Sequence, residues 1–206
     1  ARPAAMNIFD RLPQSLPTNG ASVPDGMENL SEEERACIEE FGNRIGTISI
    51  PAKTLLLEEG KVADILYLIK KGCLRLFFLD DGRDITFQFF FEGDFVASFD
   101  SMHRHLPSRF SLESIEATEA VAIGRNDLYG LLRNVPSLRL LYEEKLTDRF
   151  RTYQQLFLSR IRDTPRQRYE ELLRERPDIV RRVPQHYIAS YLGITPVSLS
   201  RIRNRR

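Results

Sequence analysis

The pattern of apolar and polar positions divides the chain into a central strand region with helical regions on both sides. Between Ile48 and Ile123, short apolar runs alternate with turn residues such as Glu59-Gly60 and Asp80-Asp81-Gly82. An Asp-Gly pair between apolar runs favours a β-hairpin, because glycine adopts the positive φ that the turn requires. Many short strands at such spacing indicate a roll, sandwich or jelly roll. The predicted strands are 55–57, 65–69, 74–79, 85–91, 95–97, 110–115 and 120–123.

Capping signals and prolines mark the predicted helices. Ser31 and Glu34 form a capping box before a helix that ends near residue 44, since the serine accepts the third helical N–H and the glutamate reaches back. After residue 123, helices are expected over 126–134, where Pro136 closes the helix, over 137–162, and from Thr164, where a second capping box begins. Residues 1–30 carry four prolines and little periodicity, so we expect an arm there.

The long helix carries an apolar stripe that predicts a partner along its length. The stripe follows steps of three and four on a helix about 39 Å long at ~1.5 Å per residue. Because this spacing is close to a heptad, we expect a dimer seam with a second copy; packing on the strand region of the same chain is the alternative. The stripe consists of Leu138, Leu141 or Tyr142, Leu146, Phe150, Tyr153, Phe157 and Ile161.

The last part of the chain has the spacing of a helix–turn–helix over residues 185–204. Gly193 follows the first helix and allows a left-handed turn residue. Thr195 then caps the second helix, and Pro196 occupies its first turn. Ala189 stands where the two helices are expected to cross, so that a large side chain would collide. The apolar contact between them is assigned to Ile188, Leu192, Ile194, Leu199 and Ile202.

The charge is divided unevenly between this end and the rest of the chain. The formal net charge is only +1, but residues 160–206 hold 12 arginines and 5 acidic residues, whereas residues 1–159 have a net charge of −6. Such an uneven distribution of charge indicates that the basic segment binds a polyanion. A recognition helix presents its N-terminal residues to base edges in the major groove, which here are Thr195, Pro196, Val197 and Ser198.

One turn further along, Arg201 could contact guanine O6 and N7 with two hydrogen bonds. Val197 offers only apolar contact, for instance to a thymine methyl group. Ser198, Ser200, Gln185 and Arg203 are better placed for phosphates, which set affinity and its salt dependence. We therefore predict binding to double-stranded DNA, with a dimer doubling the set of contacts.

These features together resemble the Crp/Fnr superfamily of bacterial transcription regulators over residues 31–206. The motifs are Glu59-Gly60, the run 63–72, Glu92-Gly93-Asp94-Phe95 and the run 187–203. The resemblance implies an α+β fold: an N-terminal arm (1–30), a cyclic-nucleotide-binding-like jelly-roll or β-roll sensor domain (31–136), a dimerisation helix (137–162) and a helical DNA-binding domain (163–206). It also implies a cytoplasmic homodimer on a palindromic operator, with RNA polymerase and a small-molecule effector as further partners.

The effector site departs from the pattern of the family's cyclic-nucleotide binders. Those proteins follow Gly-Asp-Phe with a Gly-Glu pair, whose glutamate takes the ribose 2′-hydroxyl, and an arginine then takes the phosphate. Here Ala97-Ser98 replaces the pair, and Arg109 near the phosphate position precedes Phe110. We therefore do not expect cyclic AMP. The candidate effector pocket consists of Phe87, Phe90, Val96, Ser98 and Arg109, with Arg109 equally compatible with an anion ligand or a surface ion pair.

Other protein classes explain less of the sequence. A cupin-like β-roll metalloenzyme is the alternative suggested by His103-Arg104-His105, but it needs a third histidine and a nearby carboxylate. A small-molecule-binding module or a protein-interaction module would leave the arginine-rich end unexplained. No apolar run approaches the ~18 residues of a membrane span. Two cysteines exclude an all-cysteine iron–sulfur site and suit a reducing cytosol, and Cys73 is expected in the core. We expect no cofactor and no enzymatic activity.

Overall fold

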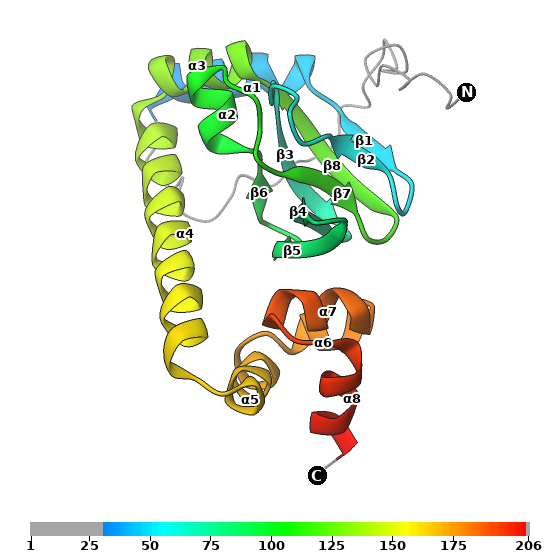
Figure 1. Ribbon diagram of the computed structural model, residues 1–206. Helices are drawn as coiled ribbons and strands as arrows, with labels where there is room; N and C mark the ends of the chain where they lie inside the picture. The colour runs from blue at the N-terminus through cyan, green and yellow to red at the C-terminus, as the bar shows by residue number, and fades with distance from the viewer. Residues whose placement is uncertain (1–30, 205–206) are drawn as a thin grey trace, which may run out of the picture.

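The computed structural model describes residues 31–204, in which two antiparallel sheets, one long helix and a group of short helices are stacked along one direction (Figure 1). The first sheet has the order β1 (Thr47–Ile50), β8 (Thr118–Gly124), β3 (Ile65–Lys71) and β6 (Phe95–Val96). The second has the order β2 (Leu55–Leu57), β7 (Ser111–Ser114), β4 (Leu74–Asp80) and β5 (Arg83–Phe90). We call these eight strands the β-roll.

Helices lie before, between and after the strands. Before the β-roll comes α1 (Glu32–Arg44), and α2 (Phe99–Arg104) lies between β6 and β7. After β8 follow α3 (Arg125–Asn134) and the long α4 (Pro136–Arg162). The C-terminal helical domain consists of α5 (Pro165–Glu175), α6 (Pro177–Arg182), α7 (Gln185–Leu192) and α8 (Pro196–Asn204). Within residues 31–204, no helix is both long and apolar enough to span a membrane.

The predicted strands and caps are confirmed, with small shifts at their ends. Both capping boxes form, at Ser31 and at Thr164. Asp81 and Gly82 both have positive φ, as a two-residue turn between β4 and β5 requires. The helix before Pro136 ends at Asn134, as predicted, and Pro136 also opens α4, where its missing N–H costs nothing. The helices α2 and α6 were not predicted, because six residues are too few to show a periodicity.

The buried apolar residues form three cores within residues 31–204. The first fills the β-roll between its sheets and includes Tyr67, Leu74, Phe90 and Leu112. The second joins Cys73, Phe89 and Phe91 of the β-roll to the buried residues of the C-terminal helical domain. The third packs α2 and α3 against the first sheet. Cys73 is fully buried, as predicted, and burial raises the pKa of its thiol to about 12. The second core holds the C-terminal helical domain against the β-roll.

The apolar stripe of α4 is divided between the β-roll of the same chain and solvent. Tyr142 stacks on Phe95 with ring centroids 5.6 Å apart, and Tyr153 lies 5.0 Å from Phe87, so one face packs on the β-roll of the same chain. The other face is open to solvent. Packing on the β-roll of the same chain, the alternative for the stripe, therefore accounts for part of it, and a dimer seam along the exposed part stays a prediction. The exposed apolar residues of the second face are Leu140, Phe150, Phe157, Leu158 and Ile161.

Gly72 occupies the closest backbone approach among the glycines of the described residues. It links β3 to β4 with φ +108°, and a Cβ there would lie 2.7 Å from Thr118 Cα and 2.8 Å from the carbonyl oxygen of Ala117. Gly82 also has a positive φ of +75°, but a Cβ there would meet nothing within 4 Å. Alanine substitutions at the two glycines therefore compare backbone strain with overlap, at Gly72, and backbone strain alone, at Gly82.

We expect Gly72→Ala to lower the free energy of unfolding by roughly 2–4 kcal/mol, because strain and overlap add at this position. Gly82→Ala has the strain alone and should cost about 1 kcal/mol. Urea denaturation followed by circular dichroism measures both. Equal losses for the two variants would show that the strand β8 can move away from Gly72 at no cost.

Candidate nucleic-acid interface

The helix–turn–helix forms as its spacing predicts. Gly193 is left-handed, with φ 68° and ψ 35°, and ends α7. The hydroxyl oxygen of Thr195 accepts the backbone N–H of Ser198 at 3.1 Å, which caps α8. Ala189 and Leu199 are fully buried where α7 and α8 pack together. These contacts set the direction of α8, which points away from the β-roll (Figure 1).

The side chains predicted to contact DNA are mostly open to solvent. Thr195, Pro196, Val197, Ser200, Arg201 and Gln185 are exposed, and Ser198 and Arg203 are half-buried. The side chain of Val197 is 60% exposed, although it is apolar. The hydroxyl of Ser198 is 3.0 Å from that of Thr195, so it belongs to the helix cap as well as to the face. All but Gln185, which begins α7, therefore lie on α8 or at its N-terminal cap.

Most arginines of the C-terminal segment have structural partners, so the charge count overstated the surface available to a polyanion. The paired arginines are Arg160, Arg162, Arg166, Arg168, Arg174, Arg176 and Arg182. Within residues 160–204, only Arg181, Arg201 and Arg203 have no hydrogen-bond or ion-pair partner in the described structure. Two of these three lie on α8, the helix that the spacing assigned to DNA.

A buried arginine of the β-roll fixes the position of α7. The side chain of Arg75 is 2% exposed, and its guanidinium donates to both carboxylate oxygens of Asp84 at 2.6 Å. Its Nε donates to Glu113 at 2.9 Å, and its face lies 3.8 Å from the ring of Tyr187 on α7. Burial alone would lower the pKa of Arg75, but the hydrogen bonds of the two carboxylates raise it. Sequence reasoning missed this cluster, because its members are far apart in the chain.

The edge strand of the second sheet is covered by α7. The N–H of Thr86 on β5 donates to Ser190 Oγ at 2.8 Å, and Ser190 Oγ donates to the carbonyl oxygen of Asp84 at 2.9 Å. An edge strand has unpaired backbone groups that need such partners when they are buried. The serine therefore takes the place of a neighbouring strand and joins α7 to β5.

A second arginine connects the domains from the opposite side. Arg182, at the end of α6, donates to both carboxylate oxygens of Glu92 at 2.8 Å and also pairs with Glu116. The hydrogen bonds from Arg182 lower the pKa of Glu92 to about 2. Arg182 and Arg176 both lie over the ring of Phe91, at 4.8 and 5.3 Å from its centroid. The C-terminal helical domain is thus held by charged contacts on both sides of a shared apolar core.

The five residues of the predicted effector pocket do not lie together. Three are buried in the β-roll, and two line a cavity beside α4. Phe90 and Val96 are fully buried in the β-roll, and Ser98 is hydrogen bonded by Ser108 at 2.8 Å, so these three do not line the cavity. Phe87 and Arg109 do line it. Of the two roles left open for Arg109, a surface ion pair is absent within the described residues. The sequence could not separate these residues, because neighbouring strand positions face different sides.

An arginine of α4 occupies the space beside Gly93-Asp94-Phe95-Val96. The Nη2 of Arg149 donates to the carbonyl oxygen of Phe95 at 2.6 Å, and the guanidinium carbon lies 4.7–5.2 Å from the ring centroids of Phe90, Phe95 and Phe99. Its Nη1 is buried without a hydrogen-bond partner in the described structure. Burial lowers the pKa of Arg149. The chain thus places its own cation beside the Gly93-Asp94-Phe95 motif.

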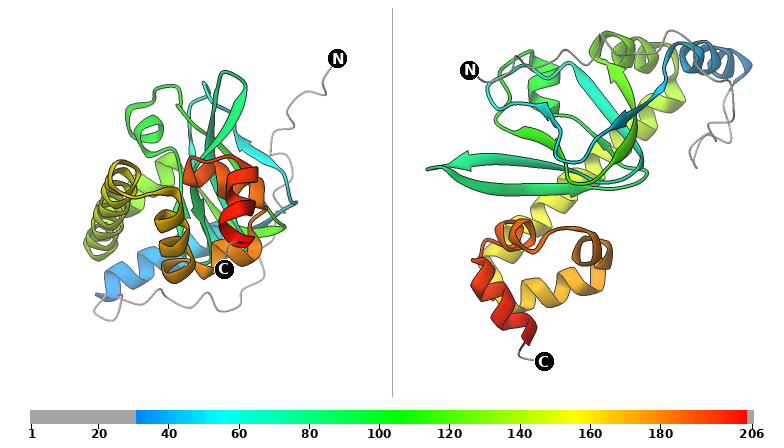
Figure 2. Two further views of the ribbon diagram at one scale, coloured as in Figure 1. Left: turned by 60° about the horizontal axis from the view of Figure 1, so that its bottom comes forward. Right: turned by 90° about the vertical axis from the view of Figure 1, so that its right-hand side faces the viewer.

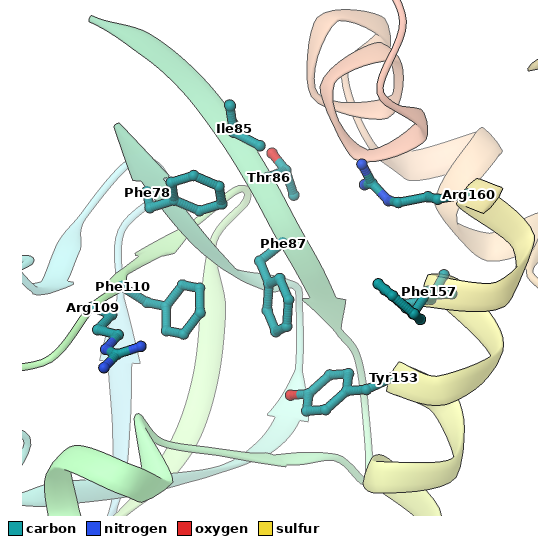
Figure 3. A pocket seen from close by; sticks show the side chains of 10 residues that line it. Phe78, Ile85, Thr86, Phe87, Arg109, Phe110, Tyr153, Phe157 and Arg160 are labelled. Atoms are coloured by element: carbon teal, nitrogen blue, oxygen red, sulfur yellow. The ribbon is translucent and has the colours of Figure 1, made fainter. Parts of the chain in front are cut away.

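The cavity lies between β4, β5, the two residues before β7 and α4, and has a volume of about 450 Å³ (Figure 3). Its walls are largely aromatic, with Phe87 and Phe110 stacked at 4.7 Å between ring centroids. Figure 3 shows Arg109 and Arg160 at opposite ends, with the phenylalanines between them. The remaining lining residues are Phe78, Ile85, Thr86, Tyr153, Leu156 and Phe157.

The two histidines that suggested a metal site do not converge. His103 Nδ1 lies 3.3 Å from the hydroxyl of Tyr129, and His105 Nδ1 lies 3.7 Å from a carboxylate oxygen of Asp64. Among residues 31–204, no group of three or more His, Cys, Asp or Glu side chains could hold a metal ion. The described structure therefore does not contain the ligand set that a cupin-like enzyme requires.

Comparisons with known proteins agree with this architecture. Residues 47–135 match the family model of the cyclic nucleotide-binding domain. FixK2 from Bradyrhizobium japonicum is 21% identical, with a TM-score of 0.65 over 78% of this chain and 83% of that one. The c-di-GMP responsive global regulator CLP from Xanthomonas campestris is 19% identical, with a TM-score of 0.65 over 83% and 90%.

A transcriptional regulator of the Crp/Fnr family from Eubacterium rectale is 18% identical, with a TM-score of 0.64 over 85% of this chain and 82% of that one. No curated protein sequence matches the chain. The solved relatives are regulators rather than enzymes, and at these identities the likeness establishes the fold. The α+β fold class and the resemblance in architecture are confirmed.

We expect Arg75→Met to lower the free energy of unfolding by roughly 3–5 kcal/mol, because it leaves two partly buried carboxylates without a counter-charge. Arg83→Met is the matched control, since Arg83 is 73% exposed and pairs only with Asp80; it should cost under about 1 kcal/mol. Thermal and urea denaturation measure both variants. A loss for Arg75→Met as small as that of the control would show that Asp84 and Glu113 become solvated.

Proposed function

We propose that this chain, which has the fold of the Crp/Fnr transcription regulators, is a homodimeric, sequence-specific DNA-binding regulator that acts in the cytoplasm. The observation that carries the proposal is the exposed end of α8. Within the described residues, Arg201 and Arg203 have no hydrogen-bond or ion-pair partner, whereas seven other arginines of 160–204 are paired, and Val197 is exposed although it is apolar. An α-helix with such a face fits the major groove of B-DNA.

The roles of the α8 residues follow from their positions. Arg201 lies one turn beyond the helix N-terminus, where a guanidinium can make two hydrogen bonds to guanine. Thr195, Pro196, Val197 and Ser198 lie closer to the N-terminus and supply short contacts to base edges. Phosphates are assigned to Gln185, Ser200 and Arg203. RNA polymerase as a further partner rests on the resemblance alone.

A homodimer is supported by the outer face of α4. Phe157 and Ile161 are 65% and 70% exposed, and Phe150 is 62% exposed; Phe157 stands at the edge of this face, where it also lines the cavity. These residues are separated by seven and four positions, which is the spacing of a two-helix seam. A second copy would cover this face and bring two recognition helices onto one DNA duplex, where half-sites are spaced about 34–36 Å apart.

We further propose that the β-roll does not bind cyclic AMP. Three of the five candidate pocket residues are occupied, since Ser98 bonds Ser108 and both Phe90 and Val96 are buried, and Arg149 lies against Phe95. Only Phe87 and Arg109 of that set line the cavity. A nucleotide would have to displace Arg149 from three aromatic rings. Isothermal titration calorimetry of the protein with cyclic AMP should give no binding heat, and micromolar binding would overturn this proposal.

We expect Arg201→Ala to weaken binding to the selected site by roughly 1–3 kcal/mol and to relax selection at one base pair. Arg203→Ala should weaken binding to all sequences and reduce the slope of affinity against salt by about one. Arg166→Ala is the control, because Arg166 is paired with Glu170 on α5. Selection from random DNA, followed by titration of fluorescent duplexes, measures these effects. Unchanged affinity and selectivity of Arg201→Ala would contradict the assignment of α8.

We expect Phe150→Glu to convert the dimer to a monomer, because the dimer would bury a carboxylate of each copy without a partner. The protomer should keep its fold, since Phe150 is 62% exposed in it. Leu79→Glu is the control, because Leu79 is 59% exposed at the end of β4, away from α4. Size-exclusion chromatography with light scattering reports the mass. A wild-type monomer, or a dimeric Phe150→Glu protein, would contradict the proposed seam.

A further inference from the structure

We propose that Gln154 fixes the orientation and register of the two α4 helices in the homodimer, by pairing with the Gln154 of the second copy at the centre of the seam. The inference rests on the proposed function, because it concerns the face of α4 through which the homodimer would form. It assigns to one polar side chain a choice that apolar residues alone do not make, namely which position of one helix lies opposite which position of the other.

Gln154 stands in the middle of the exposed apolar face of α4. On an α-helix, side chains three, four and seven positions apart lie on the same side. At these steps from Gln154 lie four apolar side chains that are each more than half exposed: Phe150, Phe157, Leu158 and Ile161. Gln154 is itself exposed. Any partner that covers the four apolar residues therefore also covers this amide.

The exposed face follows a heptad repeat through the C-terminal half of α4. Its core positions are separated by alternating steps of three and four residues: Thr147, Phe150, Gln154, Phe157 and Ile161. These are the a and d positions of a coiled coil, and Gln154 takes an a position. A heptad seam packs on a helix with the same repeat, which a second copy of α4 supplies. In two parallel helices in register, the same a residue of both copies meets at the two-fold axis.

The amide of Gln154 would be satisfied in only one arrangement of the two helices. Within residues 31–204, its side chain has no hydrogen-bond partner. An amide that is removed from water without a partner costs free energy. A carboxamide both donates and accepts hydrogen bonds, so the two Gln154 side chains can pair with each other when the helices are parallel and in register.

Other arrangements leave this amide against apolar groups. If one helix is shifted by one heptad, the Gln154 of one copy faces the partner's Ile161, which offers no hydrogen bond. In an antiparallel pair, an a position lies opposite a d position, so Gln154 would face a phenylalanine. A single polar residue at an a position is known to specify register and the number of chains, at a cost in stability.

Thr147, the other polar residue at an a position of this face, makes no such demand on a partner. Its hydroxyl donates to the backbone carbonyl oxygen of Glu143 at 2.9 Å, one turn earlier in the same helix. Its methyl group is thereby left for the seam, and β-branched residues at a positions suit two-stranded coiled coils. Among the five core positions of residues 147–161, Gln154 is therefore the one whose polar group needs the second copy.

The register of the seam determines how far apart the two recognition helices lie. The helix α4 ends at Arg162 and leads directly into α5 of the C-terminal helical domain (Figure 1). A shift by one heptad would move one of these domains about 10 Å along α4 relative to the other, at ~1.5 Å per residue. Half-sites on DNA are spaced by a fixed ~34–36 Å, so a dimer with a variable register would lose one of its two half-sites.

The first experiment tests orientation and register by disulfide formation in the full chain. The background is Cys37→Ser, because Cys73 is fully buried and unreactive. On oxidation, Thr147→Cys should link the two copies, since a parallel pair in register brings the two thiols together. Thr152→Cys is the matched control: its hydroxyl makes the same bond, to the carbonyl oxygen of Asp148 at 3.0 Å, but it lies on the opposite side of α4. No cross-link in Thr147→Cys, or equal cross-linking of both variants, would overturn the proposed arrangement.

The second experiment isolates Gln154, at protein concentrations at which each variant is fully dimeric. In the Thr147→Cys chain, Gln154→Leu should lower the cross-linked fraction about threefold or more as other registers are populated. Sedimentation of the chain without the added thiol should show a dimer Kd lowered about tenfold or more, because the seam no longer buries a polar pair. Gln155→Leu removes the same amide one position away, off the seam, and should change neither quantity. Gln154→Asn keeps a carboxamide and should keep the cross-link.

The outcomes separate this inference from the proposed function. A monomeric wild-type protein would overturn the homodimer, and the role of Gln154 with it. A dimer in which Gln154→Leu and Gln155→Leu have the same cross-linked fraction and the same Kd would leave the homodimer standing and overturn only the role of Gln154. A loss of the cross-link in Gln154→Leu but not in Gln155→Leu or Gln154→Asn is the result that we expect.

Discussion

The position of the C-terminal helical domain depends on the burial of one guanidinium. Arg75 stands on β4 in the middle of the second sheet, and a charge so deeply buried is tolerated only when it is paired and hydrogen bonded. Asp84 and Glu113 supply the pairing from β5 and β7, and the ring of Tyr187 covers the remaining face. Tyr187 belongs to α7, so the helix–turn–helix completes the environment of a charge in the β-roll.

Other contacts between the two parts follow from this arrangement. Because α7 lies on Arg75, its Ser190 reaches the backbone of β5, and the ring of its Tyr191 lies beside that of Phe89, with centroids 5.2 Å apart. The last turn of α7 then comes within reach of Arg160 on α4. The helix α8 packs mainly on α7 and extends away from the β-roll (Figure 2). The same docking therefore buries one face of the helix–turn–helix and exposes the other.

Local patterns predicted the parts that depend on neighbouring residues. The capping boxes at Ser31 and Thr164, the Asp81-Gly82 turn and the left-handed Gly193 are each decided within a few residues, so they could be predicted without the rest of the fold. The stripe of α4 could not be divided between its two faces, because an apolar residue has the same periodicity whether it meets its own β-roll or solvent. The cluster around Arg75 brings together positions separated by up to 112 residues and leaves no local signal.

The arginine-rich end shows most clearly which features follow from the sequence and which require the tertiary structure. The sequence by itself determined that residues 160–206 are basic, that two short helices meet at Gly193, and that Arg201 lies on the second of them. Only the tertiary structure decided which arginines remain available, because Arg182 reaches Glu92 and Glu116 of the β-roll and Arg160 reaches the end of α7. Charge is a property of composition, whereas its pairing depends on which distant groups the fold brings within a few ångströms.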